Sequence, residues 1–370
     1  MNGAFQTDCF EILKQRLARG EIGRRDFLKG IALLGVAPLA LKSGMLSAQE
    51  KQFVLVNWGG DAIKAFDEAF AQPFAKASGL TVKIDGAGPT EGAIQAQVTS
   101  GKVSWDVVDA DIFSAEALGK KGFVQKINFD VVKKDKILEG GWNDYAVANY
   151  YLSYVLVYDK EKYGDTPPKT WADFFDVEKF PGKRTMYKWM VGNLEAALLA
   201  DGVAPDKLYP LDVDRAFKKI KAFSPNIAGF WGSGAESQQL MLEGEASMGL
   251  LWNTRAKLID KDSEGKITYG FAEGFLGPSS WAIMKDNPAG AEAANAFIAS
   301  AQDPAGQVKL LELLGNGPAN PAAAAMVPAE LKKDDCTQPE AVKVQHQLDQ
   351  SWYVENYSAT LDKFLALISS

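Results

Sequence analysis

The sequence FVLVNWGGD, residues 53–61, joins an apolar and β-branched segment to a pair of glycines. Such a segment is typical of a buried strand that ends at a turn. Beyond the turn, aromatic and aliphatic residues recur at the three- and four-residue spacing of one helix face: Ile63, Phe66, Phe70 and Phe74. The region therefore predicts a strand, a glycine turn and an amphipathic helix, in that order.

The same alternation continues along the chain. Residues 80–84 and 105–109 have the composition of strands, and residues 90–100 that of a helix between them. Strands that alternate with helices of this length predict parallel pairing with helices on both faces. Ligands of such sheets gather beyond the carboxyl ends of the strands, where we expect Trp58, Gly60 and Asp109 to lie.

A second α/β set follows the apolar segment 150–158 and the turn at Pro167-Pro168. It is predicted to contain strands at 184–188 and 246–252, with helices at 192–200, 212–223, 235–243 and from Asn253 onward. The chain then runs through residues 275–284 to helices at 289–301 and 304–314. Because no internal repeat and no low-complexity linker separates the halves, we expect two α/β lobes that exchange strands.

The N-terminus predicts an export signal. Arg24 and Arg25 are followed by Phe-Leu-Lys and an apolar run from Gly30 to Leu41. That run is shorter than the roughly 20 residues needed to cross a bilayer. The layout resembles a twin-arginine signal, with cleavage expected after Ala48 and periplasmic location as the consequence. An amphipathic N-terminal helix is the alternative.

The net charge of the chain argues against two classes of partner. Without residues 1–48 the chain has 33 basic and 43 acidic residues, a formal net charge of −10. Such an acidic chain does not favour nucleic acid or an anionic membrane as its main partner. No later segment is long and apolar enough to span a membrane.

The scarcity of cysteine and histidine limits catalysis. Cys9 lies in the predicted signal, Cys336 then has no partner, and His346 is the only histidine. Histidine- and cysteine-rich zinc sites are therefore excluded, and the sequence has no nucleophile elbow, phosphate-binding loop or dinucleotide fingerprint. We expect no metal, no cofactor and no enzymatic activity. Hydrolysis by carboxylates alone stays open, although no pair of acids stands out.

Four segments carry a resemblance to a known family. They are NWG at 57–59, KTWADFF at 169–175, LEGEASMGLLWNTR at 242–255 and GNGPANPAA at 315–323. In this order they resemble the type II periplasmic solute-binding proteins of ABC importers, in the branch of spermidine/putrescine-binding proteins and their amino-acid-binding relatives. The resemblance implies two lobes joined by crossing strands, one small ligand in the cleft, delivery to an inner-membrane permease, and a monomer.

The resemblance also implies lobe boundaries. Each lobe is expected to hold a mainly parallel sheet flanked by helices. The first lobe would comprise residues 49–150 and 276–318, and the second residues 151–275 and 319–370, after a signal at 1–48.

Site residues follow from the family positions. Polyamine-binding members hold ammonium groups with carboxylates and the methylene chain with aromatic rings. The aromatic positions are filled at or next to Trp58, Tyr151, Trp231 and Trp252. We expect the acidic positions to be depleted, since Lys188 and Trp189 stand where the family has its first acids and Ser279 where it has a later one.

Arg255 changes the expected ligand. It stands in the first turn of the helix after Trp252-Asn253, where a cation opposes the helix dipole unless an anion is bound there. Relatives with Trp-Asn-x-Arg bind small carboxylates, including amino acids, through this arginine. The resemblance therefore implies a small organic carboxylate or amino acid held by Arg255 and aromatic rings. A polyamine is the alternative ligand.

Other interpretations of these residues stay open. Trp58 and Trp252 can also be interpreted as core residues at strand ends. Arg255 can be interpreted as a solvated residue of a helix face, paired with Asp260 or Asp262. Tyr150-Tyr151 is similar to the tyrosine pair of iron-binding relatives. Neighbouring side chains of a strand point to opposite faces, however, which favours one pocket ring and one core ring.

Overall fold

The computed structural model describes residues 52–369. The predicted export signal, residues 1–48, lies outside the described residues. Within them no helix is long and apolar enough to span a membrane.

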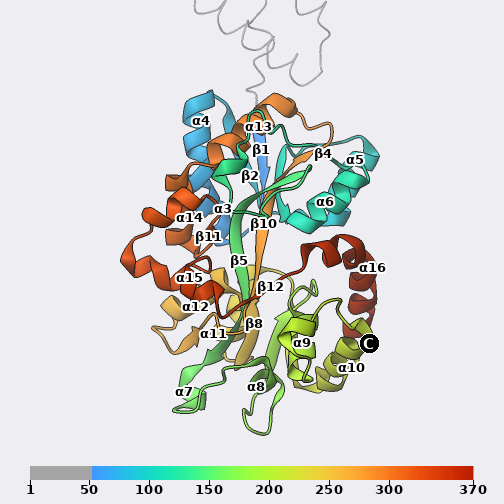
Figure 1. Cartoon of the computed structure of the whole chain (residues 1–370), viewed down its shortest axis with the longest axis vertical. Coiled ribbons are helices and arrows are strands. Elements are labelled where there is room, and N and C mark those ends of the chain that lie inside the picture. The colour runs from blue at the N-terminus through green and yellow to red at the C-terminus, as the bar shows by residue number, and fades with distance from the viewer. Residues whose placement is uncertain (1–51, 370) are drawn as a thin grey trace, which may run out of the picture. The chain divides into compact units, whose positions relative to one another are not determined.

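Strands and helices alternate through most of the chain (Figure 1). The strands are β1 Gln52–Val56, β2 Thr81–Asp85, β3 Val107–Asp111, β4 Val124–Gln125, β5 Ala146–Asp159, β6 Arg184–Tyr187, β7 Ile227–Trp231, β8 Met248–Trp252, β9 Ile267–Tyr269, β10 Phe275–Met284, β11 Gly317–Pro318 and β12 His346–Gln347. The α-helices are α3 Asp61–Phe66, α4 Gln72–Ser78, α5 Glu91–Ser100, α6 Ile112–Lys120, α7 Lys160–Tyr163, α8 Trp171–Phe175, α9 Asn193–Ala200, α10 Val213–Phe223, α11 Gly234–Leu242, α12 Asn253–Asp262, α13 Gly290–Ala301, α14 Pro304–Leu314, α15 Pro339–Val342 and α16 Gln350–Ile368.

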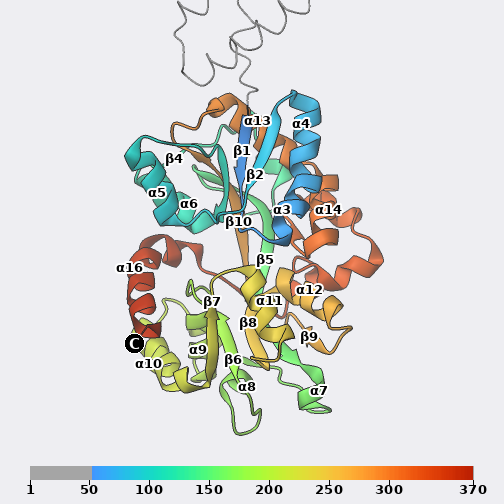
Figure 2. The ribbon, with the colours of Figure 1, turned by 180° about the vertical axis from the view of Figure 1, so that it is seen from behind.

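The sheet follows the order β2-β1-β3-β10-β5-β8-β6-β7. Pairing is parallel at both ends, where β1 lies between β2 and β3, and β6 between β7 and β8. In the middle, β10 and β5 run antiparallel to each other and to their outer neighbours β3 and β8. Figure 2 shows β6, β7 and β8 at the opposite end of the unit from β1 and β2. The predicted α/β class, with two lobes joined by crossing strands, is confirmed.

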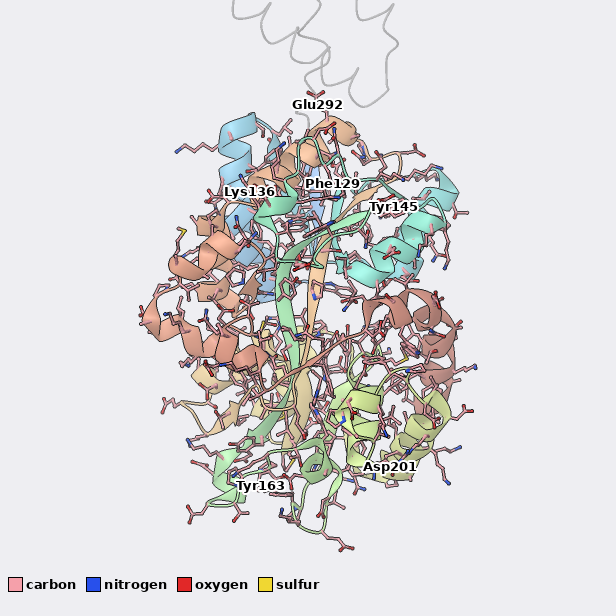
Figure 3. The ribbon with its side chains drawn as sticks, viewed as in Figure 1. Phe129, Lys136, Tyr145, Tyr163, Asp201 and Glu292 are labelled. Atoms are coloured by element: carbon pink, nitrogen blue, oxygen red, sulfur yellow. The ribbon has the colours of Figure 1, made fainter. Side chains whose placement is uncertain are left out.

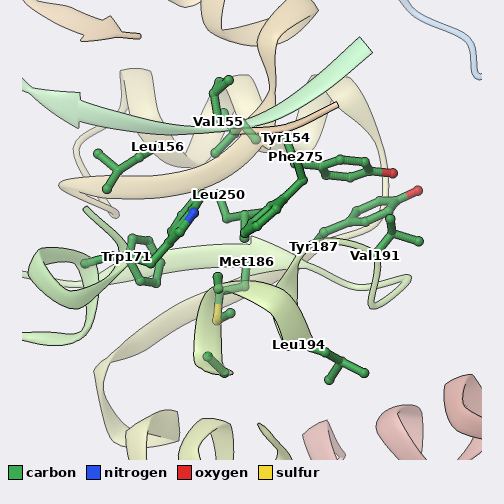
Figure 4. Packing of buried hydrophobic residues seen from close by; sticks show 14 of the residues in the cluster. Tyr154, Val155, Leu156, Trp171, Met186, Tyr187, Val191, Leu194, Leu250 and Phe275 are labelled. Atoms are coloured by element: carbon green, nitrogen blue, oxygen red, sulfur yellow. The ribbon is translucent and has the colours of Figure 1, made fainter. Parts of the chain in front are cut away.

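The two long strands pass through both hydrophobic cores. Val147 and Tyr150 of β5 pack with the core around β1, whereas Val155 and Val157 pack with the core around β6 and β8. Phe275 of β10 belongs to the second core, whereas Trp281 and Ile283 belong to the first. Figure 4 shows part of the second core, with the Tyr154 and Tyr187 rings adjacent and their hydroxyls pointing out of the cluster.

The predicted helix after β1 differs in one detail. Phe66, Phe70 and Phe74 are buried as expected, but Ile63 is 42 % exposed. A π-helical turn, Asp67–Ala71, joins α3 to α4 and shifts the register of the buried face by one residue.

Charged side chains such as Asp201 and Glu292 lie at the outside of the molecule (Figure 3).

The C-terminal helix α16 contacts α6 and α10. Its Tyr353 stacks on Phe113 of α6 at a ring-centroid distance of 4.8 Å, and its Phe364 is buried in the second core. This helix therefore connects the second lobe with a helix of the first.

Candidate ligand-binding cleft

A glycine turn after β1 sets the position of Trp58. Asn57 Oδ1 accepts a hydrogen bond from the Gly59 amide at 2.9 Å, and Asn57 Nδ2 donates to the Ala62 carbonyl at 2.9 Å. Gly59 has φ +75°, and a Cβ there would lie 2.7 Å from the Gly86 carbonyl oxygen. Only glycine fits this turn. The turn begins α3 and leaves the Trp58 ring half-buried in the cleft.

Aromatic rings from both lobes meet at the cleft. The centroids of Trp58 and Trp252 are 6.4 Å apart. Trp252 is also in edge contact with Trp231, at 4.9 Å, and with Tyr187, at 5.3 Å. Trp231 is fully buried and its Nε1 donates to the Leu250 carbonyl at 3.0 Å. It therefore supports Trp252 from behind and is not part of the cavity wall.

The Trp-Asn-Thr-Arg segment places its three larger side chains differently. Asn253 Oδ1 accepts from the Ser153 amide at 2.8 Å, and its Nδ2 donates to the Gly315 carbonyl at 2.8 Å. These bonds fix the start of α12 against β5 and the loop after α14. Trp252 before it and Arg255 after it both face the cavity.

Arg255 is buried against the first lobe. Its side chain forms an ion pair with Asp61 of α3 at 3.2 Å and weaker hydrogen bonds, each 3.4 Å long, to Gln238 Oε1 and the Gly59 carbonyl. The residue is 3 % exposed, and burial lowers the pKa of its guanidinium, an effect that Asp61 and Tyr150 oppose. The solvated arginine paired with Asp260 or Asp262 is thus excluded.

One nitrogen of the Arg255 guanidinium lacks a partner among the described residues. Its buried Nε has no hydrogen-bond acceptor among residues 52–369. Nε and the adjacent Nη2 form one of the two edges with which arginine binds a carboxylate through parallel hydrogen bonds. A carboxylate in the cleft would supply the missing acceptor.

Two glycines lie next to this guanidinium, and one of them, Gly234, is needed to make room for it. A Cβ on Gly234, the first residue of α11, would overlap Arg255 Nε. A Cβ on Gly60 would lie 3.8 Å from Nη2. Gly60 is therefore next to the arginine but is not part of the cavity wall.

A hydrogen-bonded group of side chains surrounds Asp109, which lies in the middle of β3 and not at its end as expected. The carboxylate accepts from Asn149 Nδ2 and the Tyr150 hydroxyl, both at 2.9 Å, and from Ser279 Oγ at 2.8 Å. Burial raises the pKa of Asp109 to about 6, although these hydrogen bonds oppose the rise. Asp109 thus orients Tyr150 and Ser279 at the cavity wall.

Asp111 lies two residues farther along β3 and is less constrained. Its carboxylate has no hydrogen-bond donor in the described part of the chain. Burial raises its pKa to about 7, and the negative charges of Asp109 and Glu91 add to the rise. An unpartnered carboxylate in such a place favours a cationic ligand group.

These side chains enclose a cavity with an empty volume of about 530 Å³, part of it open to solvent. The sequence-predicted residues that line it are Trp58, Asp109, Trp252, Arg255 and Ser279. Trp189 lines a second, adjacent cavity. Trp231, Gly60 and Tyr151 line neither of the two cavities.

The tyrosine pair differs from the expectation. Tyr151 is 8 % exposed and packs in the core of the first lobe, while its neighbour Tyr150 lines the cavity. The positions expected to lack acids hold Lys188, Trp189 and Ser279, and the carboxylates that line the cavity come instead from β3.

Sequence reasoning missed Asp111, Tyr154 and Tyr187 among the lining residues. Asp111 had a usable signal, because residues i and i+2 of a strand share a face and Asp109 was already placed at the strand end. Tyr154 and Tyr187 had none, since aromatic residues on buried strands have the pattern of core. No group of three potential metal ligands occurs within residues 52–369.

Comparison with known proteins assigns the family. A family model described as bacterial extracellular solute-binding protein matches residues 69–338. The chain belongs to this family. The gamma-aminobutyric acid-binding protein of Pseudomonas aeruginosa is 30 % identical over 86 % of this chain and 91 % of its own length.

Two further relatives are informative. The crystal structure of an ABC transporter substrate-binding protein from Bradyrhizobium japonicum is 35 % identical, covers 85 % of this chain and 99 % of its own, and has a TM-score of 0.79. The spermidine/putrescine-binding periplasmic protein of Escherichia coli is more distant, at 21 % identity over 60 % of this chain and 65 % of its own length. The chain is a solute-binding protein of the ABC-importer type and not an enzyme.

Proposed function

We propose that this chain is the periplasmic receptor of an ABC importer for a small amino acid whose carboxylate and amine lie at opposite ends, with 4-aminobutanoate as the simplest example. The observation that carries the proposal is the buried Arg255 guanidinium with its unpartnered Nε. The relative from Pseudomonas aeruginosa, named for binding gamma-aminobutyric acid, supports it.

The cavity has an anionic end as well. Asp111 has no hydrogen-bond donor within residues 52–369, and Asp109 and the Tyr150 hydroxyl line the same cavity. An ammonium group would neutralise the carboxylate that burial disfavours. Arg255 would hold the ligand carboxylate and Asp111 its amine.

Apolar rings suit the methylene chain between the two charges. Trp58 from the first lobe and Trp252 from the second both line the cavity, with centroids 6.4 Å apart. Rings on both lobes gain contact when the cleft closes on a ligand, which couples binding to closure.

The function is tested by calorimetric titration of the wild-type protein with four ligands of similar length. We expect 4-aminobutanoate to bind, and butanoate, 1-aminobutane and putrescine to bind at least 30-fold more weakly, because each leaves one charged group of the cleft unpaired, at a cost of about 2–5 kcal/mol. Binding of putrescine without binding of either carboxylate would contradict the proposal and establish the polyamine alternative.

Compartment and assembly are part of the same proposal. The Arg24-Arg25 signal would direct the folded chain to the periplasm, and the receptor would act as a monomer that meets its permease there. Replacing both arginines by lysine should retain the precursor in the cytoplasm. Normal periplasmic maturation of that variant, seen by fractionation, would rule out the twin-arginine route.

The division into lobes also stays a proposal: residues 49–150 and 276–318, then 151–275 and 319–370. The paths of β5 and β10 through both cores support crossings near residues 151 and 276. Near residue 319, the packing favours a return of the chain to the second lobe that lies farther along the sequence than residue 319. Asn320 still hydrogen-bonds to the Gln302 carbonyl and to Gln307 Oε1, on the first-lobe side.

A further inference from the structure

A second cavity continues from the first. It has an empty volume of about 970 Å³, part of it open to solvent, and shares Trp58, Asp111 and Tyr187 with the cavity that contains Arg255. Its other walls come from the start of α5 and from α16, on opposite sides of the cleft. We call it the distal chamber, because it lies beyond Asp111 as seen from Arg255.

The distal chamber is acidic. Its lining includes the carboxylates of Glu91, Asp111 and Asp362 and contains no lysine or arginine. Glu91 Oε1 accepts a hydrogen bond from Ser114 at 2.8 Å, which fixes one carboxylate at the chamber wall. Asp362 is exposed on α16 and faces it from the other lobe.

Aromatic rings accompany the acids. Trp58 and Tyr187 stand at the junction of the two cavities, and Trp189 and Tyr357 line the distal chamber itself. Carboxylates combined with ring faces are the surroundings that bind ammonium and guanidinium groups on apolar stems.

The proximal cavity gives a direction to any ligand that enters. The buried and unpartnered Arg255 Nε fixes the carboxylate, so the remainder of the ligand extends toward Asp111 and the junction. We propose that the distal chamber is a second subsite, in which Glu91 and Asp362 bind the cationic end of an amino acid longer than 4-aminobutanoate. This inference rests on the proposed function, since it needs the carboxylate at Arg255.

The two walls contribute in different ways. Glu91 comes from the first lobe and Asp362 from the second, so a cation between them is held by both lobes only when the cleft is closed. A long ligand should therefore dissociate more slowly than a short one, as well as bind more tightly.

The test compares ligand length with removal of the distal charges. Wild type, Glu91→Gln, Asp362→Asn and the double variant are titrated with 4-aminobutanoate, 6-aminohexanoate and 4-guanidinobutanoate. The amide of Glu91→Gln retains an oxygen for the Ser114 hydroxyl, so the local fold is preserved. Glu355→Gln is the matched control, because Glu355 is an exposed acid of α16 outside the chamber lining.

We expect at least one of the two longer ligands to bind wild type more tightly than 4-aminobutanoate does. The double variant should lose at least tenfold more affinity for that ligand than for 4-aminobutanoate, and the control should change neither. Equal losses for short and long ligands, or no binding of either longer ligand by a wild type that binds 4-aminobutanoate, would overturn the distal subsite and leave the proposed function intact. Absence of all carboxylate binding would instead refute the proposed function.

Discussion

At the scale of single residues, the ionised Asp111 carboxylate lowers the stability of the unliganded protein. Its carboxylate is placed where burial and two neighbouring acids oppose ionisation, and no donor in the described chain compensates. Its folded-state pKa of about 7 lies above the ordinary value of 3.8. The ionised form therefore destabilises the unliganded fold, fully above pH 7 and progressively less as the pH falls toward 4.

Asp111→Asn should raise the melting temperature of the unliganded protein at pH 8, and the gain should shrink at pH 6 and vanish near pH 4. Thermal unfolding followed by circular dichroism across this range checks the prediction. Asp165→Asn, at an exposed aspartate, is the control. A gain that does not depend on pH would show that the charge of Asp111 is not its cause. The groups that face Asp111 are Asp109, Glu91 and nearby tyrosine hydroxyls.

Residue-level prediction from sequence depended on distinctive chemistry. Arg255 was recognisable because a cation in the first turn of a helix is unfavourable without an anion. Tyr150 and Tyr151 are identical neighbours, so only the register of the strand decides which side chain faces the cleft. The sequence contains no local signal for that register, which depends on pairing with β10 more than 120 residues away.

At the scale of elements, the packing of α11 against α12 determines the position of Arg255. Gly234→Ala should displace the guanidinium, because the new Cβ would overlap Nε. We expect at least a tenfold loss of affinity for 4-aminobutanoate with little change in stability, since the overlap involves the end of a flexible side chain. Calorimetry and thermal unfolding together check both parts.

Gly232→Ala is the control for this substitution. A Cβ at Gly232 would meet Lys188 Cδ at 3.5 Å and Glu236 Oε2 at 3.7 Å, which are ordinary contacts. An equal loss of affinity in both variants would indicate a general effect on the loop before α11 and contradict the steric explanation.

Among the elements, those with strong local patterns were predictable. The observed bounds agree with the expected segments to within a few residues for five strands and for most of the helices that follow them. These strands are β1, β2, β3, β6 and β8. The crossing strand β10 was seen only as an unassigned segment, because a proline and a glycine interrupt it and its pairing is entirely long-range. Helix α16 was missed because its buried residues, such as Tyr353 and Phe364, are separated by polar ones.

At the scale of the whole molecule, binding should stabilise the fold. A ligand bound only by the folded protein adds about 2.7 kcal/mol at a concentration 100 times its Kd. For a folded unit of this size we expect the melting temperature to rise by about 4 °C. Differential scanning fluorimetry with 4-aminobutanoate checks this, and the rise should follow the logarithm of ligand concentration. A constant melting temperature over that range would contradict specific binding.

The contact that joins the two lobes at the site provides the most direct test. Arg255 of the second lobe forms an ion pair with Asp61 and a hydrogen bond with the Gly59 carbonyl, both in the first lobe. Its Nε has no hydrogen-bond acceptor among the described residues. Calorimetric titration of 4-aminobutanoate into wild type and Arg255→Ala measures what this guanidinium contributes. We predict a loss of about 2–5 kcal/mol, a factor of roughly 30 to a few thousand in Kd. Equal affinity in the two proteins would contradict the assignment of Arg255 as the carboxylate anchor.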